Sequence, residues 1–417
     1  MTFYKHPYLF VYGAESFMIR QAKAFNDKGI DVVITFPIYK SFGPFSLSGW
    51  AILYNGKLVC VRNVEGVKHY IADLNEKMTC EGVFVHTFWE TKLNELYDII
   101  SFRKEAVVYI HDFASCCKNH NLTKNDECFC GSGIVGEEKC HDCKYYEAGK
   151  KARKDAMRFL NGDVKLKIIF PSENTKKIWV EAYPFASESK HELCVVGHHS
   201  VLSECEGECI QKDYSNRKIR VAFIGNGTVI KGWQKWIEAV DAIQKTPAAD
   251  RYEFYHLGNT PESRDCINFI PVSVKEDKDA MIHAMQEHDI DAVLLFSGWP
   301  ETYSYTYYES LAADKFVITS EYSGNIKEQV ESRKNGVVLS YDSEALLEYL
   351  KDTNKVEKDL QTYYSSPRTL PKEMVENKSY LEWLHEEESP AYRNLSKGRR
   401  QLLLEALYRF RYRRDEI

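Results

Sequence analysis

The sequence predicts an α/β protein made of two doubly wound, Rossmann-like domains in tandem. Three observations indicate this fold class. The chain has 417 residues, which favours two domains over one small core. Short β-rich runs alternate with helical patterns through the first half, as in parallel sheets covered by helices on both faces. A second alternation of the same kind begins near residue 219.

In the first half, apolar runs bounded by turn signals predict the strands. The run 8–12 is followed by a helical pattern over 15–28. Asn55 and Gly56 predict a two-residue hairpin turn between two short strands. Further strands are expected at 30–36, which Pro37 closes, and at 82–85, 106–110 and 167–170, with a helical stretch over 89–100.

The second half repeats the pattern after a polar, acidic and aperiodic segment, which predicts an interdomain linker at 206–218. The domains are therefore expected at 1–205 and 219–390. Ligands of doubly wound sheets bind outside the carboxyl ends of the strands, so two such edges should face each other across a cleft. The strands of this half are expected at 220–224, 252–257, 291–296, 315–319 and 336–339.

Composition narrows the possible partners. The chain is 44% hydrophobic and 28% charged, with a net charge of -6 that gives no general attraction to nucleic acid or anionic lipid. The first residues do not resemble a secretion signal, and no run approaches the roughly 18 apolar residues of a membrane span. We therefore expect a cytoplasmic protein without a nucleic-acid partner.

Two glutamates flank the start of a predicted helix. The strand at 292–296 leads into a loop that contains Glu301, and the pattern predicts a helix over 302–313 that contains Glu309. The N-terminus of a helix offers unpaired N–H groups and a partial positive charge, which suit a diphosphate. A carboxylate further along the helix suits a pair of sugar hydroxyls, such as those of ribose.

Residues 296–324 resemble the donor-binding signature of the family 4 glycosyltransferases. The resemblance comprises a serine after a strand, two glutamates separated by seven residues, a small-residue helix, another strand and a glycine-containing turn, and Asn335 and Gly336 continue it. It implies the GT-B fold and retaining hexosyl transfer from a nucleoside-diphosphate sugar, UDP- or GDP-linked, without a catalytic cofactor. The implied acceptor is a glycan or a lipid-linked acceptor in cell-surface polysaccharide synthesis.

The resemblance also assigns roles on the donor side. It implies that Glu301 lies at the donor sugar, that Glu309 binds the ribose hydroxyls, and that the backbone of Ser304, Tyr305 and Thr306 surrounds the diphosphate. The family usually has glycine at the position of Ser304. Serine keeps the backbone N–H, so we expect the binding function to be retained.

A cation should stabilise the departing diphosphate. Lys231, before Gly232, matches the family's lysine and is expected to contact the phosphates, beside the glycine turn that contains Gly227. The family's arginine position falls on Asn226, which can donate a hydrogen bond but carries no charge. The pair of cations that the family uses is therefore altered in this chain.

On the acceptor side, the strand 107–110 leads into His111, which matches a family histidine near the donor sugar and the acceptor. A histidine in this position can also be a purely structural hydrogen-bonding residue. Gly13 matches the family's acceptor-side loop, and a simple turn residue is the alternative.

A cysteine-rich insertion over 113–145 resembles one found in a subset of the family. Four thiolates with a terminal C-x₂-C suit a closed, structural zinc site. By position we favour Cys117, Cys130, Cys140 and Cys143 as the ligands, and reduced thiols without metal are the alternative. The competing ligands are Cys116, Cys128, His120 and His141.

The C-terminal segment 391–417 is basic with interleaved aromatic residues. A helix of this kind can lie on an anionic membrane and bring the protein to the inner face of the membrane. It can also pack back on the first domain, as the final helix does in this fold, and the two interpretations are compatible.

Two other functions remain open. The same architecture serves sugar-nucleotide epimerases and phosphorylases. A catalytically silent binding subunit is a third class, which Asn226 and Ser304 suggest because both depart from the family pattern.

Overall fold

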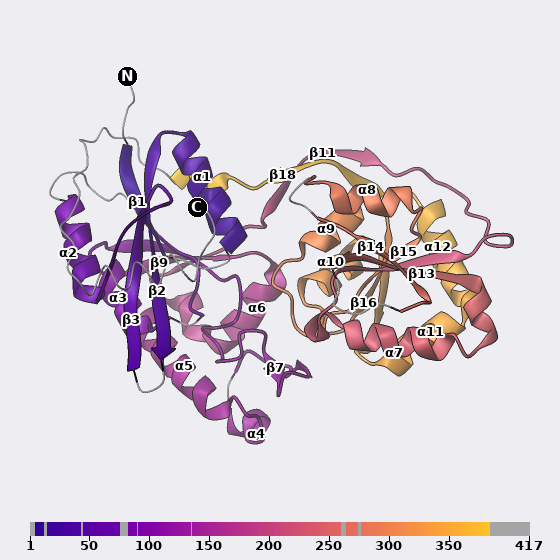
Figure 1. The fold of residues 1–417 in the computed structure, drawn as a ribbon, viewed down its shortest axis with the longest axis horizontal. Helices are drawn as coiled ribbons and strands as arrows, with labels where there is room; N and C mark the ends of the chain where they lie inside the picture. Colours follow the sequence, from indigo (N-terminus) through magenta and orange to yellow (C-terminus); the bar gives the residue numbers. More distant parts are fainter. Residues whose placement is uncertain are drawn as a thin grey trace.

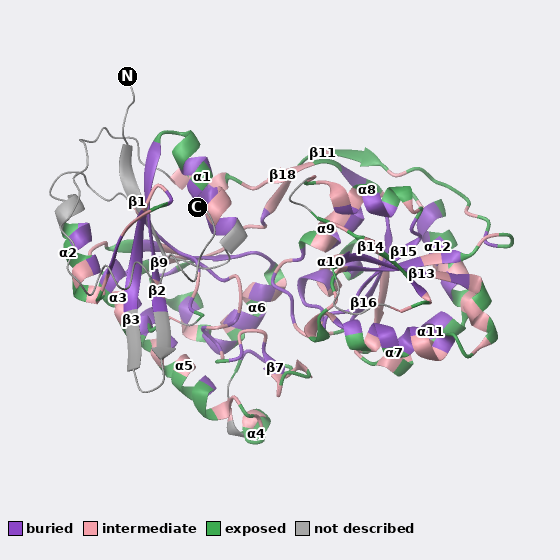
Figure 2. Cartoon of the chain, in the orientation of Figure 1, coloured by how far each residue is buried: buried purple, intermediate pink, exposed green. Residues whose placement is uncertain are grey.

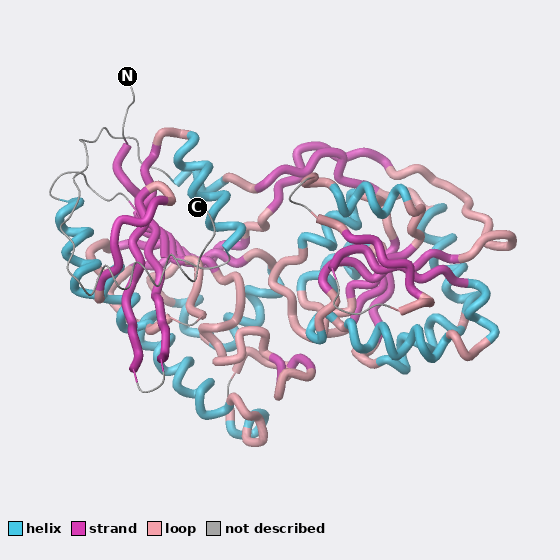
Figure 3. The backbone as a smooth tube through the Cα atoms, viewed as in Figure 1, coloured by secondary structure: helices cyan, strands magenta, loops and turns pink. Residues whose placement is uncertain are grey.

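The structure, a computed structural model, describes residues 5–11, 15–42, 45–75, 82–89, 91–134, 136–259, 264–273 and 277–383. It contains two α/β units, each with helices packed around a twisted sheet (Figures 1 and 3). The predicted fold class is confirmed. Gly13 and the basic segment 391–417 lie outside the described residues, so their predicted roles stay predictions.

The first unit is built on an eight-stranded sheet with the order β10-β9-β6-β5-β1-β2-β3-β4. Neighbouring strands are parallel from β10 to β2, and β3 and β4 add an antiparallel hairpin. The strands are β1 (Lys5–Val11), β2 (Ile30–Phe42), β3 (Phe45–Tyr54), β4 (Lys57–Arg62), β5 (Gly82–Val85), β6 (Glu105–Tyr109), β9 (Lys165–Phe170) and β10 (Glu192–Val195). The helices are α1 (Glu15–Asp27), α2 (Val64–Asn75), α3 (Leu93–Ile100), α5 (Tyr146–Leu160), α6 (Glu173–Ala182) and the 3₁₀ helix η1 (Pro184–Glu188).

The second strand does not end at Pro37 as the sequence indicated. Strand β2 continues to Phe42, with Pro37 opposite Trp50 of β3. The pairing of β2 with β1 ends at Thr35, so beyond that residue β3 is the one described neighbour. Proline is tolerated in such a position because the ladder on the open side does not need its missing N–H.

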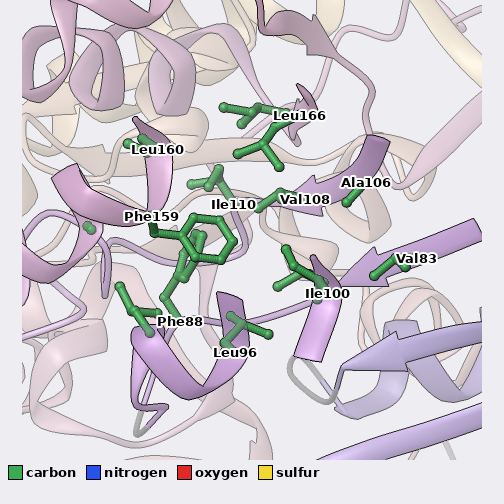
Figure 4. Packing of buried hydrophobic residues seen from close by; sticks show 14 of the residues in the cluster. Val83, Phe88, Leu96, Ile100, Ala106, Val108, Ile110, Phe159, Leu160 and Leu166 are labelled. Carbon is green, nitrogen blue, oxygen red and sulfur yellow. The ribbon is translucent and has the colours of Figure 1, made fainter. Parts of the chain in front are cut away.

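Apolar side chains at helical spacing hold the first sheet to its helices. Leu93, Leu96 and Ile100 lie on one face of α3 and are buried, and Phe159 of α5 packs against Phe88 with ring centroids 5.2 Å apart (Figure 4). The buried residues concentrate between sheet and helices, while the outer helix faces are exposed (Figure 2). This core fixes the carboxyl ends of β5 and β6, where the candidate site begins.

The second unit contains a six-stranded parallel sheet with the order β14-β13-β12-β15-β16-β17. The order reverses between β12 and β15, which is the switch point where doubly wound sheets bind their ligands. The strands are β12 (Ile219–Asn226), β13 (Tyr252–Asn259), β14 (Ile267–Pro271), β15 (Ala292–Leu295), β16 (Phe316–Ser320) and β17 (Gly336–Leu339). The helices are α7 (Trp233–Ile243), α8 (Ala280–Glu287), α9 (Tyr305–Ala312), α10 (Asn325–Arg333), α11 (Ser343–Lys351) and α12 (Thr353–Ser365), with the short helices η2 (Val229–Lys231) and η3 (Pro247–Arg251).

Two antiparallel strands connect the units (Figure 1). β11 (His199–Glu206) pairs with β18 (Thr369–Glu376), so the segment before the predicted linker is an ordered strand. The linker itself is anchored on the second unit, because Lys212 and Arg217 both pair with the buried carboxylate of Asp291. The chain then returns to the first unit, where Tyr380 of η4 (Ser379–Trp383) stacks on Phe25 of α1.

The cysteine-rich insertion lies between β6 and α5. It contains the short hairpin β7 (Thr123–Lys124) and β8 (Cys128–Phe129), followed by the single-turn helix α4 (Glu137–Cys140).

Within the described part of the chain, every helix is too short or too polar to cross a membrane.

Candidate functional site

The loops that follow β12 and β15 pack against each other at the switch point. The N–H of Gly298 donates to the carbonyl of Ile230 over 2.8 Å. Gly232 adopts φ 83°, and a Cβ there would lie 2.1 Å from the carbonyl oxygen of Phe296. Glycine is therefore required at 232, which explains the Lys-Gly pair as a consequence of this close approach.

The two charged residues predicted for the donor side meet between these loops. Lys231 Nζ lies 3.5 Å from Oε1 of Glu301, which also accepts a hydrogen bond from Ser297. Glu301 is only 3% exposed. The turn at Gly324 fixes its backbone, because the N–H of Asn325 donates to the Glu301 carbonyl over 2.9 Å. The carboxylate is thus held at one orientation beside a partly exposed cation.

Helix α9 starts three residues later than the sequence indicated. Ser304 is its N-cap, and its hydroxyl accepts from the N–H of Tyr307 over 3.3 Å. Serine is a preferred N-cap residue because its hydroxyl forms this hydrogen bond, which a glycine cannot form. A Cβ at Gly225 would lie 3.6 Å from Thr306 Cγ2, so the glycine turn after β12 lies beside the first turn of α9.

Asn226 and Gly227 continue this turn. Asn226 is the exposed last residue of β12, and the N–H of Gly227 donates to the Asn259 carbonyl over 3.0 Å. The imidazole of the buried His256 contacts the Gly225 carbonyl over 2.9 Å and holds the turn from the adjacent strand. The turn therefore presents backbone groups, and an uncharged side chain, at the start of α9.

A cation from the first unit also reaches α9. Arg20 of α1 donates to the hydroxyl of Tyr305 over 2.7 Å and pairs with Glu376 of β18 at 3.1 Å. Nothing in the sequence pattern pointed to Arg20, since it is one of two basic residues on the amphipathic helix α1.

Glu309 lies one turn into α9, largely buried. Among the described residues, none forms a hydrogen bond or an ion pair with its carboxylate. Burial raises the pKa of Glu309 to about 7, and the nearby Asp279 carboxylate adds to the effect. A buried carboxyl group without a described partner is available for an external hydrogen-bond donor.

His111 stands just beyond the carboxyl end of β6. The hydroxyl of Thr302 donates to the His111 carbonyl over 2.7 Å, which joins the loop before α9 to the first sheet. Burial lowers the pKa of His111 to about 3, so the imidazole is neutral at pH 7. It can exchange hydrogen bonds there, but it does not supply a positive charge.

Two further histidines gather around His111 that the sequence interpretation missed. His86 follows β5, with its Nδ1 3.5 Å from Nε2 of His111, and His198 follows β10, with ring centroids 5.3 Å from His111. His198 Nδ1 also lies 3.0 Å from the Tyr305 hydroxyl. The same signal that pointed to His111, a histidine after an apolar strand, was present at both positions.

Comparison with known proteins bears on the fold. No protein-family model and no curated protein matches the sequence. HepE from Anabaena in complex with UDP superimposes with a TM-score of 0.50 at 13% identity, over 87% of this chain and 93% of that chain. The chain has the GT-B fold. Two other matching structures are sucrose-phosphate synthase from Thermosynechococcus elongatus (TM-score 0.48, 11% identity, 86% and 94% covered) and a glycosyltransferase from Rickettsia africae (0.46, 14%, 86% and 93%).

In the insertion, the four favoured cysteines are near enough to interact electrostatically. The pKa of Cys117 is raised to about 11, mainly by burial and in smaller part by the neighbouring thiols of Cys130, Cys140 and Cys143. Cys130 interacts with Cys140 and Cys143 in the same way. In the described residues, however, no three metal-ligating side chains converge closely enough to hold an ion.

The other candidate zinc ligands have different neighbours. Cys116 is fully buried beside Tyr183, and Cys128 interacts with Lys235 and Glu321 of the second unit. His120 packs on Trp89, and His141 is largely exposed.

The tip of the insertion, at β8, contacts the second domain of the GT-B fold. The N–H of Phe129 donates to the Gly298 carbonyl over 2.7 Å, and its ring lies 6.0 Å from that of Tyr322. Gly298 belongs to the loop that carries Glu301. The insertion thus contacts the candidate site directly.

Proposed function

We propose that this protein is a glycosyltransferase that moves a hexosyl group from a nucleoside-diphosphate sugar to a glycan or lipid-linked acceptor, with retention at the anomeric carbon. The observation that carries the proposal is the meeting of Lys231, Glu301 and the N-terminus of α9 at the switch point between β12 and β15. HepE, which shares the fold, was solved with UDP.

Each group at the switch point suits one part of the donor. The unpaired N–H groups of the first turn of α9 and the helix dipole favour the diphosphate. Lys231 adds a full positive charge on the same side. The carboxylate of Glu309 is free to accept from two ribose hydroxyls, which would also lower its raised pKa.

The transfer step follows from this arrangement. The bond between the anomeric carbon and the phosphate oxygen breaks, and its electron pair goes to the diphosphate, where Lys231 and α9 stabilise the charge. The acceptor hydroxyl oxygen forms the new bond on the same face, and its proton passes to the departing phosphate oxygen. Glu301, which Lys231 and Ser297 hold in place, orients the sugar hydroxyls. The neutral imidazole of His111 lies on the acceptor side of the site.

Turnover of a panel of UDP- and GDP-sugars, with and without glycan acceptors, tests the proposal. We expect nucleotide release to rise at least tenfold when the right acceptor is present, and the product to keep the donor's anomeric configuration by NMR. An inverted product would contradict the retaining mechanism. Acceptor-independent conversion of the sugar would instead favour an epimerase.

The uncharged Asn226 favours a second candidate, a binding subunit without catalytic activity. Such a subunit would bind a nucleotide sugar through Glu309 and Lys231 without turning it over. Asn226→Arg is the informative variant, because it restores the family's second cation. A rate that appears only in this variant would support the binding subunit.

We propose separately that the insertion holds a structural zinc ion through Cys117, Cys130, Cys140 and Cys143. Their mutual proximity and the terminal C-x₂-C support this, and binding would have to draw the sulfurs together. Metal analysis of protein purified without added zinc tests it, with one zinc per chain expected. The role proposed for the metal is to hold the insertion tip against Gly298, with no part in the transfer step.

A further inference from the structure

Trp89 stands exposed at the ligand-binding edge of the first sheet. All seven tryptophans lie in the described residues, and Trp89 is the exposed one, at 47%. It follows the carboxyl end of β5, which neighbours β6, the strand that leads to His111. Single exposed apolar side chains are common, so position and surroundings must decide whether this one binds a ligand.

Local hydrogen bonds hold the backbone of Trp89 in place. The N–H of Trp89 donates to the Thr87 hydroxyl over 2.8 Å, and the Thr91 hydroxyl donates to the Trp89 carbonyl over 3.1 Å. Phe88, the preceding residue, is buried in the core against Phe159. The backbone of Trp89 is therefore held before a ligand binds, which lowers the entropy cost of binding.

Polar groups lie next to the ring. The imidazole of His120 contacts the indole with centroids 5.0 Å apart and an interplanar angle of 47°. His120 in turn interacts electrostatically with Asp112, whose Oδ1 accepts from the N–H of Ala114 over 2.8 Å. Next to Asp112, the buried Nδ1 of His111 has no hydrogen-bond partner in the described structure.

We propose that Trp89, His120 and Asp112 form a subsite for a hexopyranose unit of the acceptor. The indole would stack on the apolar C–H face of the sugar ring, and Asp112 and His120 would exchange hydrogen bonds with its hydroxyls. An amphipathic ring beside a carboxylate matches the amphipathic surface of a neutral sugar. This inference rests on the proposed function and makes the acceptor a glycan, recognised by at least one sugar unit beyond the reacting hydroxyl.

Saturation-transfer NMR with methyl hexopyranosides and unlabelled disaccharides tests the subsite without any turnover. We expect at least one of these sugars to receive saturation from the wild type and from Trp89→Phe, and to lose most of it with Trp89→Ala. Trp383→Ala is the matched control, since Trp383 lines a cavity at the amino ends of β5, β6 and β9 on the opposite edge of the same sheet. Thermal melting of all variants checks that they are folded.

Acceptor kinetics give the second readout. Trp89→Ala should raise the acceptor KM at least tenfold and leave the Kd for the nucleotide sugar within twofold. An unchanged acceptor KM, or an equal loss in Trp383→Ala, would overturn the subsite. If no nucleotide sugar binds any variant, the proposed function fails, while the NMR experiment still decides whether Trp89 binds a sugar.

Discussion

Glu309 sits in a buried position where its charge is unfavourable in the absence of a ligand. Burial and the Asp279 carboxylate raise its pKa to about 7 from an ordinary value near 4.5. The raised pKa means that the folded protein favours the neutral acid. Between pH 4.5 and 7 the folded state is progressively destabilised relative to the unfolded chain, and above pH 7 the full penalty applies.

Glu309→Gln should therefore stabilise the free protein at pH 8, by on the order of 1–3 kcal/mol, and have little effect at pH 4.5. The same change should weaken nucleotide binding at least tenfold at pH 8, because the charged acceptor for the ribose hydroxyls is lost. In the wild type, nucleotide affinity should fall as the pH drops below 7. Urea unfolding and calorimetric titration at several pH values measure both effects.

Glu331→Gln provides the comparison for Glu309, since Glu331 is an exposed residue on α10. It should change neither the stability nor the affinity by a measurable amount. Equal nucleotide affinity in Glu309→Gln and the wild type would remove the proposed ribose contact.

Ser304 shows how one residue can serve both the fold and the site. Its hydroxyl caps α9, so Ser304→Ala should lower the free energy of unfolding by about 1 kcal/mol, and Ser304→Gly by only a few tenths. Both variants keep the backbone N–H, so nucleotide affinity should change less than threefold. Urea unfolding with parallel titration measures this, and a tenfold loss of affinity in Ser304→Gly would show that the hydroxyl itself binds the ligand.

At the scale of elements, the insertion couples the four cysteines to the loop that carries Glu301. Phe129, the neighbour of Cys130, bonds to Gly298. Burial raises the pKa of Cys117 and Cys130, so zinc binding must displace protons and should weaken as the pH falls. A strong chelator should therefore release the insertion tip from the second domain.

Cys143→Ser should lower the melting temperature by roughly 3–8 °C through loss of the structural metal. Amide exchange at Phe129 should accelerate, because its hydrogen bond to Gly298 would open. Melting curves and hydrogen exchange with mass spectrometry measure the two effects.

Cys209→Ser is the matched control, because Cys209 is exposed and lies outside the insertion. A protein that contains no zinc, and a Cys143→Ser variant that melts like Cys209→Ser, would leave the four residues as simple reduced thiols.

For the whole molecule, the periodicity of apolar runs was sufficient to predict two sheets of mainly parallel strands. The family resemblance assigned Lys231 and Glu301 to the donor side of the site, and in the structure the two side chains meet at 3.5 Å. A motif within each loop was enough to find both residues, because the loops after β12 and β15 converge at the switch point of a doubly wound sheet.

Contacts between distant segments could not be predicted. The pairing of β11 with β18 joins largely polar segments that lie about 170 residues apart and show no strand alternation, so neither strand was predicted. The bond from Phe129 to Gly298 and the position of Arg20 at Tyr305 arise only when the two domains meet. The start of α9 was misplaced because Thr302 and Tyr303 continue the helical pattern although Ser304 is the cap.

The central claim is that a nucleoside diphosphate binds at the switch point of the second sheet. Calorimetric titration of UDP and GDP into the wild type, Lys231→Ala, Glu309→Gln and Lys358→Ala tests it most directly. Lys358 is an exposed lysine on α12, and this helix lies on the side of the second unit away from the first (Figure 1). We predict that one nucleotide binds the wild type and Lys358→Ala equally, and binds the other two variants at least tenfold more weakly. The account would be contradicted if neither UDP nor GDP binds the wild type, or if the nucleotide binds all four proteins with equal affinity.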